Sequence, residues 1–107
     1  MSKNQAKRNR ELKGKLAVML QVQMELYGTT GCQIGKCCRP EDPLVPEHVS
    51  TRNETDPDRY ENLGVACWSC NSWKGSRRIK EYRPESFIQR MRELDKEKGG
   101  ENGQGNL

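Results

Sequence analysis

The sequence predicts a small α+β domain in which a short β-hairpin lies between two helices and is held by a metal-binding knuckle. Three observations lead to this fold class. Only 32% of the 107 residues are hydrophobic, which is little for a self-sufficient core in so short a chain. Five cysteines fall into two groups, and small domains with thin cores commonly depend on disulfides or a metal. Apolar residues recur at helical spacing near both ends and form two short strand-like runs between them.

The first predicted element is a helix over residues 4–27, which ends at Gly28. Its apolar residues recur three and four positions apart; they are Leu12, Leu16, Met19, Leu20, Met24 and Tyr27. The following segment, GTTGCQIGKCCRPEDP, is rich in Gly, Pro and Cys and is therefore predicted to be an irregular knuckle. The stretches LVPEHV and NLGVAC then read as two strands that pair as a hairpin around a polar loop.

The C-terminal third is predicted to be helical in two pieces. The first runs from about Ser69 through CNSWKGSRRIKEY, and the second begins at Pro84, which favours the first turn of a helix. One face of the second helix is apolar: Phe87, Ile88, Met91 and Leu94. Gly99 and Gly100 are expected to end it, and the polar tail to be disordered. The predicted segments are therefore a basic amphipathic helix (1–28), a central core (29–83), a C-terminal helix (84–98) and a disordered tail (99–107).

Charge is distributed unevenly along the chain, although the net charge is only +4. Residues 1–31 carry six Lys or Arg against two Glu, and residues 72–98 carry nine against five acidic residues, whereas residues 32–71 carry four against seven. An acidic centre between basic wings suits a cation site held against a polyanion. Ordinary solvated charge on two helices is the alternative explanation.

The opening residues, MSKNQAKRNRELKGK, are charged and are followed by a short apolar cluster, which is not the pattern of a secretory signal. No apolar run is long enough to span a bilayer, so no membrane partner is expected. We therefore expect a cytoplasmic protein, in a reducing compartment where clustered cysteines more often bind metal than form disulfides.

The cysteines predict a structural zinc site. Cys67 and Cys70 are spaced so that both thiolates reach one tetrahedral ion, and Cys32 completes the set with either Cys37 or Cys38. Adjacent cysteines rarely point at the same ion. Our preferred set is Cys32, Cys37, Cys67 and Cys70, with Cys38 left over. Redox chemistry at the CWSC pair is the alternative, but it requires a longer βαβ scaffold. A closed four-thiolate site would fold the domain and leave no position for substrate.

A second cation site is predicted next to the chain's one histidine, His48. A lone histidine near a short strand is more often structural than catalytic. If zinc ties the strands to the following helix, however, Glu47 and Asn71 can converge as oxygen ligands for Mg²⁺ with His48 nearby. Phosphodiester hydrolysis needs such a cation together with a base that titrates near neutral pH. Lys74, Arg77 and Arg78 follow Asn71 and could hold flanking phosphates.

The segments CQIGKC, LVPEHV and ENLGVACWSCNSWKG, in this order, resemble the HNH endonucleases of the ββα-metal (His-Me finger) group in their zinc-ribbon form. The resemblance covers residues 32–75. It implies that His48 is the general base, that Glu47 and Asn71 bind a catalytic Mg²⁺ or Mn²⁺, and that Asn62 braces the loop that positions His48. It implies DNA as the partner, and an origin in a phage or mobile element. Glu47 stands where the family more often has Asp, and Asn71 where His is common, the HNN variation.

Two other functions remain open on the sequence alone. The first is a non-catalytic zinc module that binds DNA or protein, for which the cysteines matter and Glu47, His48 and Asn71 do not. The second is a nicking or RNA-processing subunit of a larger assembly, such as a homodimer or a phage packaging complex, because so short a chain offers little surface for reading sequence. Trp68 and Trp73 are expected to pack near the knuckle, with stacking on bases as the alternative.

Overall fold

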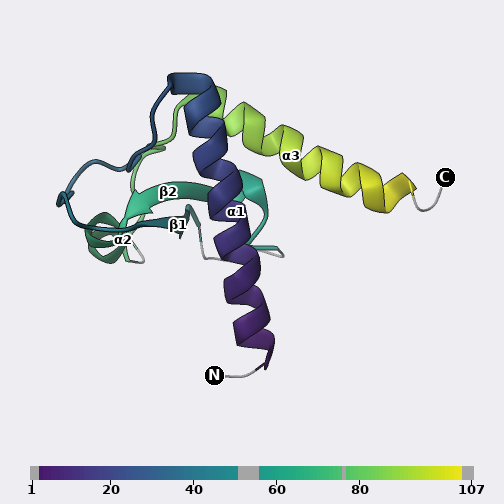
Figure 1. Cartoon of the computed structure of the whole chain (residues 1–107), viewed down its shortest axis with the longest axis horizontal. Helices are drawn as coiled ribbons and strands as arrows, with labels where there is room; N and C mark the ends of the chain where they lie inside the picture. The colour runs from purple at the N-terminus through teal and green to yellow at the C-terminus, as the bar shows by residue number, and fades with distance from the viewer. Residues whose placement is uncertain (1–2, 51–55, 76, 105–107) are drawn as a thin grey trace.

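The structure is a computed structural model that describes residues 3–50, 56–75 and 77–104, with side chains described as far as residue 97. Its elements are α1 (Lys3–Tyr27), β1 (Leu44–His48), a 3-10 turn η1 (Tyr60–Asn62), β2 (Leu63–Cys67), α2 (Trp68–Lys74) and α3 (Glu85–Gln104). The predicted α+β class is confirmed, as are the first helix and the two strands. In Figure 1, α1 crosses the hairpin. Helix α2 lies at one end of the hairpin, and α3 extends away from the hairpin on the other side.

The hairpin is antiparallel, with a register that runs from Leu44 opposite Cys67 to His48 opposite Leu63. Every residue of β2 is buried. The outer edge of β2 is covered by side chains from elsewhere: Gln33 exchanges two hydrogen bonds with Val65, each 2.8 Å long. Arg83 donates to the backbone oxygens of Glu61 and Leu63 at 2.7 and 3.0 Å. These bonds satisfy backbone groups that a two-stranded sheet would otherwise leave unpaired.

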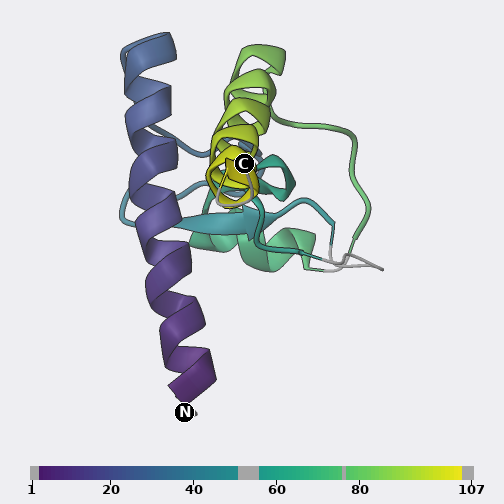
Figure 2. The ribbon, with the colours of Figure 1, turned by 90° about the vertical axis from the view of Figure 1, so that its right-hand side faces the viewer.

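The main core lies where both long helices meet β2. Its fully buried members are Met19, Val22, Leu63, Val65, Phe87 and Met91. The end of α1 also meets the start of α3 (Figure 2). There the Tyr27 Oη and Ser86 Oγ atoms are 2.6 Å apart. At the α2 end of the hairpin the core is different in kind, because Ala66, Cys67 and Cys70 form a second, smaller cluster. Cysteine therefore takes the place of aliphatic packing around α2.

The two C-terminal helices differ from the prediction. The helix expected to continue through residue 82 ends at Lys74, because Gly75 adopts a positive φ of 48° and its N–H bonds to the Asn71 oxygen at 3.0 Å. Gly reaches this conformation easily and closes the helix. Conversely, α3 continues to Gln104 and does not end at residue 98. Two glycines weaken a helix by about 1 kcal/mol each, but they do not forbid it. The rest of the predicted tail, residues 105–107, lies outside the described residues.

Within the described part of the chain, no helix combines the length and the apolar character that crossing a bilayer requires.

Candidate metal centre and catalytic site

Four cysteines from three segments come together at the end of the hairpin. The sulfur atoms of Cys32, Cys38, Cys67 and Cys70 all lie within 4.8 Å of one another. The Sγ atoms of Cys38 and Cys70 are 3.8 Å apart. Four sulfurs bound to a tetrahedral zinc at 2.3 Å would be separated by about 3.8 Å. The cluster therefore has the donor type, number and spacing of a closed structural metal site.

The predicted choice of Cys37 over Cys38 was wrong. The Sγ atom of Cys70 accepts backbone N–H bonds from Lys36 at 3.3 Å and from Cys37 at 3.1 Å, so the knuckle wraps around this sulfur. Gly35, with φ +69°, allows the turn that brings these N–H groups inward. With the backbone of Cys37 facing the sulfur, its side chain packs against the small cysteine cluster, and the following residue, Cys38, delivers its thiol to the group.

The environment of the cluster separates the acidities of its thiols. Burial alone would raise the pKa of Cys70, but the N–H donors of Cys37 and Lys36 and the neighbouring thiols lower it to about 7. The pKa of Cys38 is raised to about 12, because its thiol hydrogen-bonds with Cys32 and Cys67 and is partly desolvated. N–H donors thus favour the Cys70 thiolate, whereas hydrogen bonds with neighbouring thiols keep Cys38 protonated. A divalent cation would relieve this conflict by neutralising the thiolates it binds.

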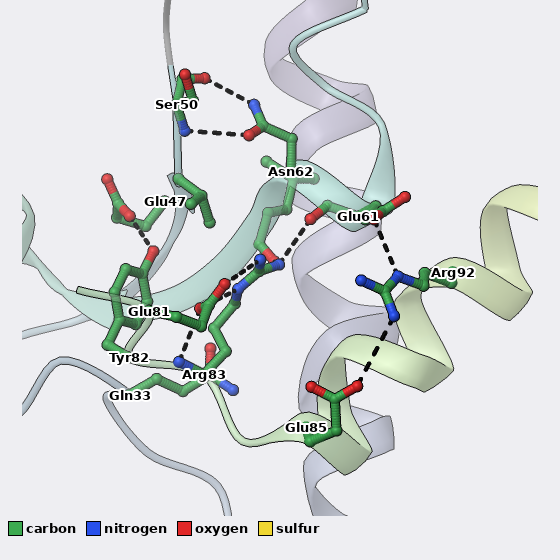
Figure 3. Close-up of polar contacts among 12 residues, drawn as sticks. Gln33, Glu47, Ser50, Glu61, Asn62, Glu81, Tyr82, Arg83, Glu85 and Arg92 are labelled. Carbon is green, nitrogen blue, oxygen red and sulfur yellow. Dashed lines mark hydrogen bonds and ion pairs between the residues drawn. The ribbon is translucent and has the colours of Figure 1, made fainter. Parts of the chain in front are cut away.

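Glu47 is buried between β1, α2 and the segment before α3. Its side chain is 3% exposed, and its carboxylate lies 3.1 Å from the Lys74 ammonium, which is 4% exposed. Tyr82 donates a hydrogen bond to the same carboxylate, as Figure 3 shows. Burial and this carboxylate raise the pKa of Tyr82 well above its usual value. Glu47 is therefore held by two donors on the α2 side of the strand.

Lys74 does not lie where a phosphate contact was predicted. Its ammonium also donates to the backbone oxygens of His48 at 2.9 Å and Val49 at 3.3 Å, so that three oxygens surround one buried cation. The prediction that Lys74 faces DNA was wrong for this arrangement, because the short helix directs its last turn toward β1. Arg77 and Arg78, beyond the end of the helix, are exposed as a phosphate contact requires.

Asn71 lies on α2 one turn before Lys74 and is half-buried. Residues three apart on a helix are neighbours. Asn71 therefore lies next to Lys74, whose ammonium contacts Glu47. Among the described residues its side chain makes no hydrogen bond, although its backbone oxygen accepts one from Gly75. The amide of Asn71 is thus free to serve a ligand.

His48 directs its imidazole away from Glu47 and toward Asp58, so the prediction that its ring lies beside the Glu47 and Asn71 ligands does not hold in this arrangement. Neighbouring residues in a strand point to opposite faces, and the Nε2 atom of His48 lies 2.7 Å from Asp58 Oδ1, on the loop that leads to β2. Arg8 of α1 holds the same carboxylate through two bonds, at 2.7 and 2.9 Å. Its hydrogen bonds, above all, lower the pKa of Asp58 to about 2 despite partial burial. An ionised Asp58 therefore orients His48, and Lys15 holds the Asp58 backbone oxygen.

Asn62 joins the two ends of the loop between the strands. Its side chain is 4% exposed in total; its Oδ1 accepts from the Ser50 N–H at 3.0 Å, and its Nδ2 donates to the Ser50 and Pro57 oxygens at 2.8 and 2.9 Å. The two Ser50 bonds are visible in Figure 3. This is the contact pattern of a loop brace, and its Ser50 end lies two residues after His48 in the chain.

Three polar residues of the site were not found from the sequence: Arg8, Asp58 and Tyr82. Each reaches the strand from a segment far away in the chain or from a loop, and single charged residues in such segments carry no periodic signal. The doublet of aspartates in the loop, Asp56 and Asp58, was the one available hint, because a carboxylate is the usual partner of an oriented imidazole.

Comparisons with known proteins add no assignment. A scan against models of protein families finds no match, and searches of curated proteins and of solved structures likewise find none. The chemistry of the chain must therefore be argued from its own residues.

Proposed function

We propose that this protein is a metal-dependent endonuclease of the HNH type that hydrolyses DNA phosphodiester bonds. One observation above all supports it: the contact between Glu47 and Lys74 brings the carboxylate of β1 against α2, one turn from Asn71. The two strands and the helix that such a site requires are thus present in the right order, with the cysteine cluster at their junction.

The proposal assigns two metals to two groups of ligands. Zn²⁺ suits the cluster of Cys32, Cys38, Cys67 and Cys70, whose sulfur spacing matches a tetrahedral ion. Mg²⁺ or Mn²⁺ suits the oxygens of Glu47 and Asn71, since hard cations prefer carboxylate and amide oxygens. When bound there, the cation would neutralise charge that develops on the phosphate. The surroundings of Glu47 already stabilise one positive charge, that of Lys74, which must give way for a metal to bind.

His48 is the proposed base; because its ring and the Glu47 carboxylate leave β1 on opposite faces, the base and the cation would have to meet at a phosphate seated at the end of the strand, where His48 is the last residue. In the tautomer that donates its Nε2–H to Asp58, the Nδ1 atom of His48 is left to accept the proton of an attacking water. Asp58 acts as a positioning residue in this step, because it holds the ring in one orientation and one tautomer. Asn62 keeps the start and end of the intervening loop together, which fixes Asp58 relative to the strand. Arg77 and Arg78 are proposed to hold phosphates of the bound DNA.

The decisive experiment is cleavage of supercoiled plasmid with Mg²⁺ or Mn²⁺. We expect the wild-type protein to convert it to open-circular or linear DNA, and His48→Ala to lose about 10²- to 10⁴-fold in rate. Met24→Ala, which removes an exposed side chain at the far end of α1, is the matched control and should cut normally. Equal cleavage by His48→Ala and the wild type, or no cleavage by either, contradicts the proposal. A structured RNA substrate run in parallel tests whether RNA is the true target.

The buried ion pair itself favours a second candidate, a zinc-stabilised binding module without catalysis. Lys74 satisfies Glu47 so completely that this carboxylate could be purely structural. In that case plasmid stays intact with every metal, and Asn71→Ala retains full DNA or protein binding. A variant of Asn71 that loses cleavage but keeps its zinc and its fold supports the nuclease instead.

A further inference from the structure

A groove beside the cysteine cluster displays the chain's two tryptophans. It encloses about 630 Å³ and is lined by Cys37, Cys38, Arg39, Trp68, Ser69, Ser72 and Trp73. This is within the roughly 300–1,000 Å³ of typical ligand sites. Trp68 is 57% exposed, which overturns the expectation that it packs in the interior, while Trp73 is half-buried.

The exposure of Trp68 follows from the cluster. Cys70 is buried on the side of α2 that faces the knuckle, so residues two positions before and after it lie on the opposite side of the helix. Trp68 and Ser72 are four positions apart and share that outer face. An indole side chain that is exposed to solvent on a helix surface is unusual, because Trp is highly buried on average.

Positive charge lies beside the Trp73 ring and along the groove. The ammonium of Lys36 lies 5.8 Å from the centre of the Trp73 ring, and the guanidinium carbon of Arg77 lies 5.2 Å from it. Arg39 lines the same groove. Nearby acidic groups are Glu41, which is exposed, and Asp42, which accepts the Ser69 N–H at 3.1 Å at the start of α2. Arg39 thus lines the groove, Lys36 and Arg77 lie beside its Trp73 ring, and one of the two carboxylates is already engaged.

We propose that this groove binds unpaired nucleobases of single-stranded nucleic acid. Exposed aromatic rings between Lys and Arg side chains are the means by which proteins stack bases while neutralising the adjoining phosphates. A base in a duplex hides both of its faces in the helical stack, so a stacking site selects unpaired strands. An acidic peptide would satisfy the cations but would leave the broad face of Trp68 without a partner. The groove is separate from Glu47 and His48, and base binding does not depend on cleavage.

Binding is tested by intrinsic tryptophan fluorescence, because both tryptophans of the chain belong to the groove. The probe is an oligothymidylate of about 12 nucleotides, within the 4–16 that single-strand sites commonly cover, in buffer without Mg²⁺ or chelator. Its controls are an abasic oligomer of equal length and charge, and the same sequence as a duplex. We expect oligothymidylate to quench the fluorescence at much lower concentration than either control. Equal binding of the abasic oligomer shows a mere polyanion surface and overturns the proposal.

Variants assign the effect to the groove, with affinities measured by anisotropy of a labelled oligomer. Trp68→Ala should weaken binding by about 5- to 150-fold, Trp68→Phe should restore most of it, and Arg39→Gln should weaken it by a smaller factor. Met24→Ala is the exposed apolar control and should bind normally. Binding is measured without Mg²⁺ and cleavage with it, so that failure of the nuclease proposal and failure of this one are told apart. Unchanged affinity of Trp68→Ala, in protein with native circular dichroism, contradicts the assignment.

Discussion

At the scale of single residues, Asp58 has the most consequential contacts in the site. Its one carboxylate receives Arg8 from α1 and His48 from β1, and its backbone oxygen receives Lys15. An isolated surface ion pair contributes little to stability, but an aspartate that three side chains contact, two at its carboxylate and one at its backbone oxygen, fixes the relative position of the segments that carry them. Asp58 therefore links the first helix to the proposed catalytic histidine.

The acidity of Asp58 is the first measurable consequence. We expect carboxyl NMR to give it a pKa of about 2, below the ordinary value of 3.8, and Arg8→Met to raise that pKa toward the ordinary value. Since the folded carboxyl is the stronger acid, its contacts stabilise the fold above about pH 4 and are lost as pH falls toward 2. Arg10→Met, on the same helix and without this contact, is the control. A pKa that is unchanged in Arg8→Met would falsify the assigned cause.

The Lys74–Glu47 pair gives a second prediction at this scale. Both side chains are almost completely buried, so removing one partner leaves an uncompensated charge. Lys74→Met should lower the free energy of unfolding by about 3–5 kcal/mol, and the double variant Lys74→Met with Glu47→Gln should recover part of the loss. Urea unfolding at neutral pH measures both. If the single variant is as stable as the wild type, the ammonium does not occupy the site in solution.

At the scale of elements, the sequence predicts those parts that have a clear period. The shared face of Phe87, Ile88 and Met91 reappears as a buried helix face. On α1 the predicted face is only partly buried, because Met24 and Tyr27 are exposed and Val22, which lies outside the predicted set, is buried. The boundaries of α2 and α3 could not be predicted, because the effect of a glycine depends on context. Gly75 ends a helix through a positive φ, whereas Gly99 and Gly100 lie within one. Nothing local to the sequence distinguishes these cases.

The prediction for the sheet concerns a substitution at Gly64, in the middle of β2. A Cβ atom there would lie 3.0 Å from Gln33 Oε1 and 3.1 Å from both Arg83 Cδ and Tyr82 Cε2. Two of these side chains seal the edge of β2, so they cannot move without breaking hydrogen bonds. Gly64→Ala should therefore cost about 1–3 kcal/mol of stability, as overpacked sites do.

Gly31→Ala is the matched control for this prediction, since its Cβ would meet no atom within 4 Å. Its thermal unfolding should differ little from that of the wild type. A Gly64→Ala protein that unfolds at the wild-type temperature would show that the segments of Gln33 and Arg83 do not pack on the strand as described.

At the scale of the whole molecule, the cysteine cluster compensates for the small apolar core. Six fully buried apolar residues hold α1, β2 and α3 together, but α2 and the knuckle are attached mainly through Cys32, Cys38, Cys67 and Cys70. The sequence predicted such a site from its spacing. The preference for Cys37 over Cys38 was wrong, because that choice depends on which way the backbone turns around the Cys70 sulfur, which spacing does not reveal.

Measurements of metal content and of stability together test whether the cysteine cluster attaches α2 and the knuckle to the apolar core. We expect about one zinc per chain, and loss of the α2 region when zinc is removed, because a closed thiolate site contributes its binding energy to folding. Circular dichroism before and after chelation, with zinc measured by mass spectrometry, gives both quantities. Native spectra after complete removal of zinc would show that the apolar core alone suffices.

The neighbouring residues Cys37 and Cys38 allow a sharper test, in which two variants that differ only in which cysteine is replaced by serine are compared. Cys38→Ser removes a sulfur that lies among the other three, whereas Cys37→Ser removes one outside the group and leaves intact the backbone N–H that Cys37 donates to Cys70. We therefore expect Cys38→Ser to bind zinc much more weakly and to melt at a lower temperature, and Cys37→Ser to keep both properties. The reverse order would mean that the knuckle turns the other way around Cys70. Glu47 and Asn71 would then be held in their present relation by the apolar core and the Lys74 ion pair.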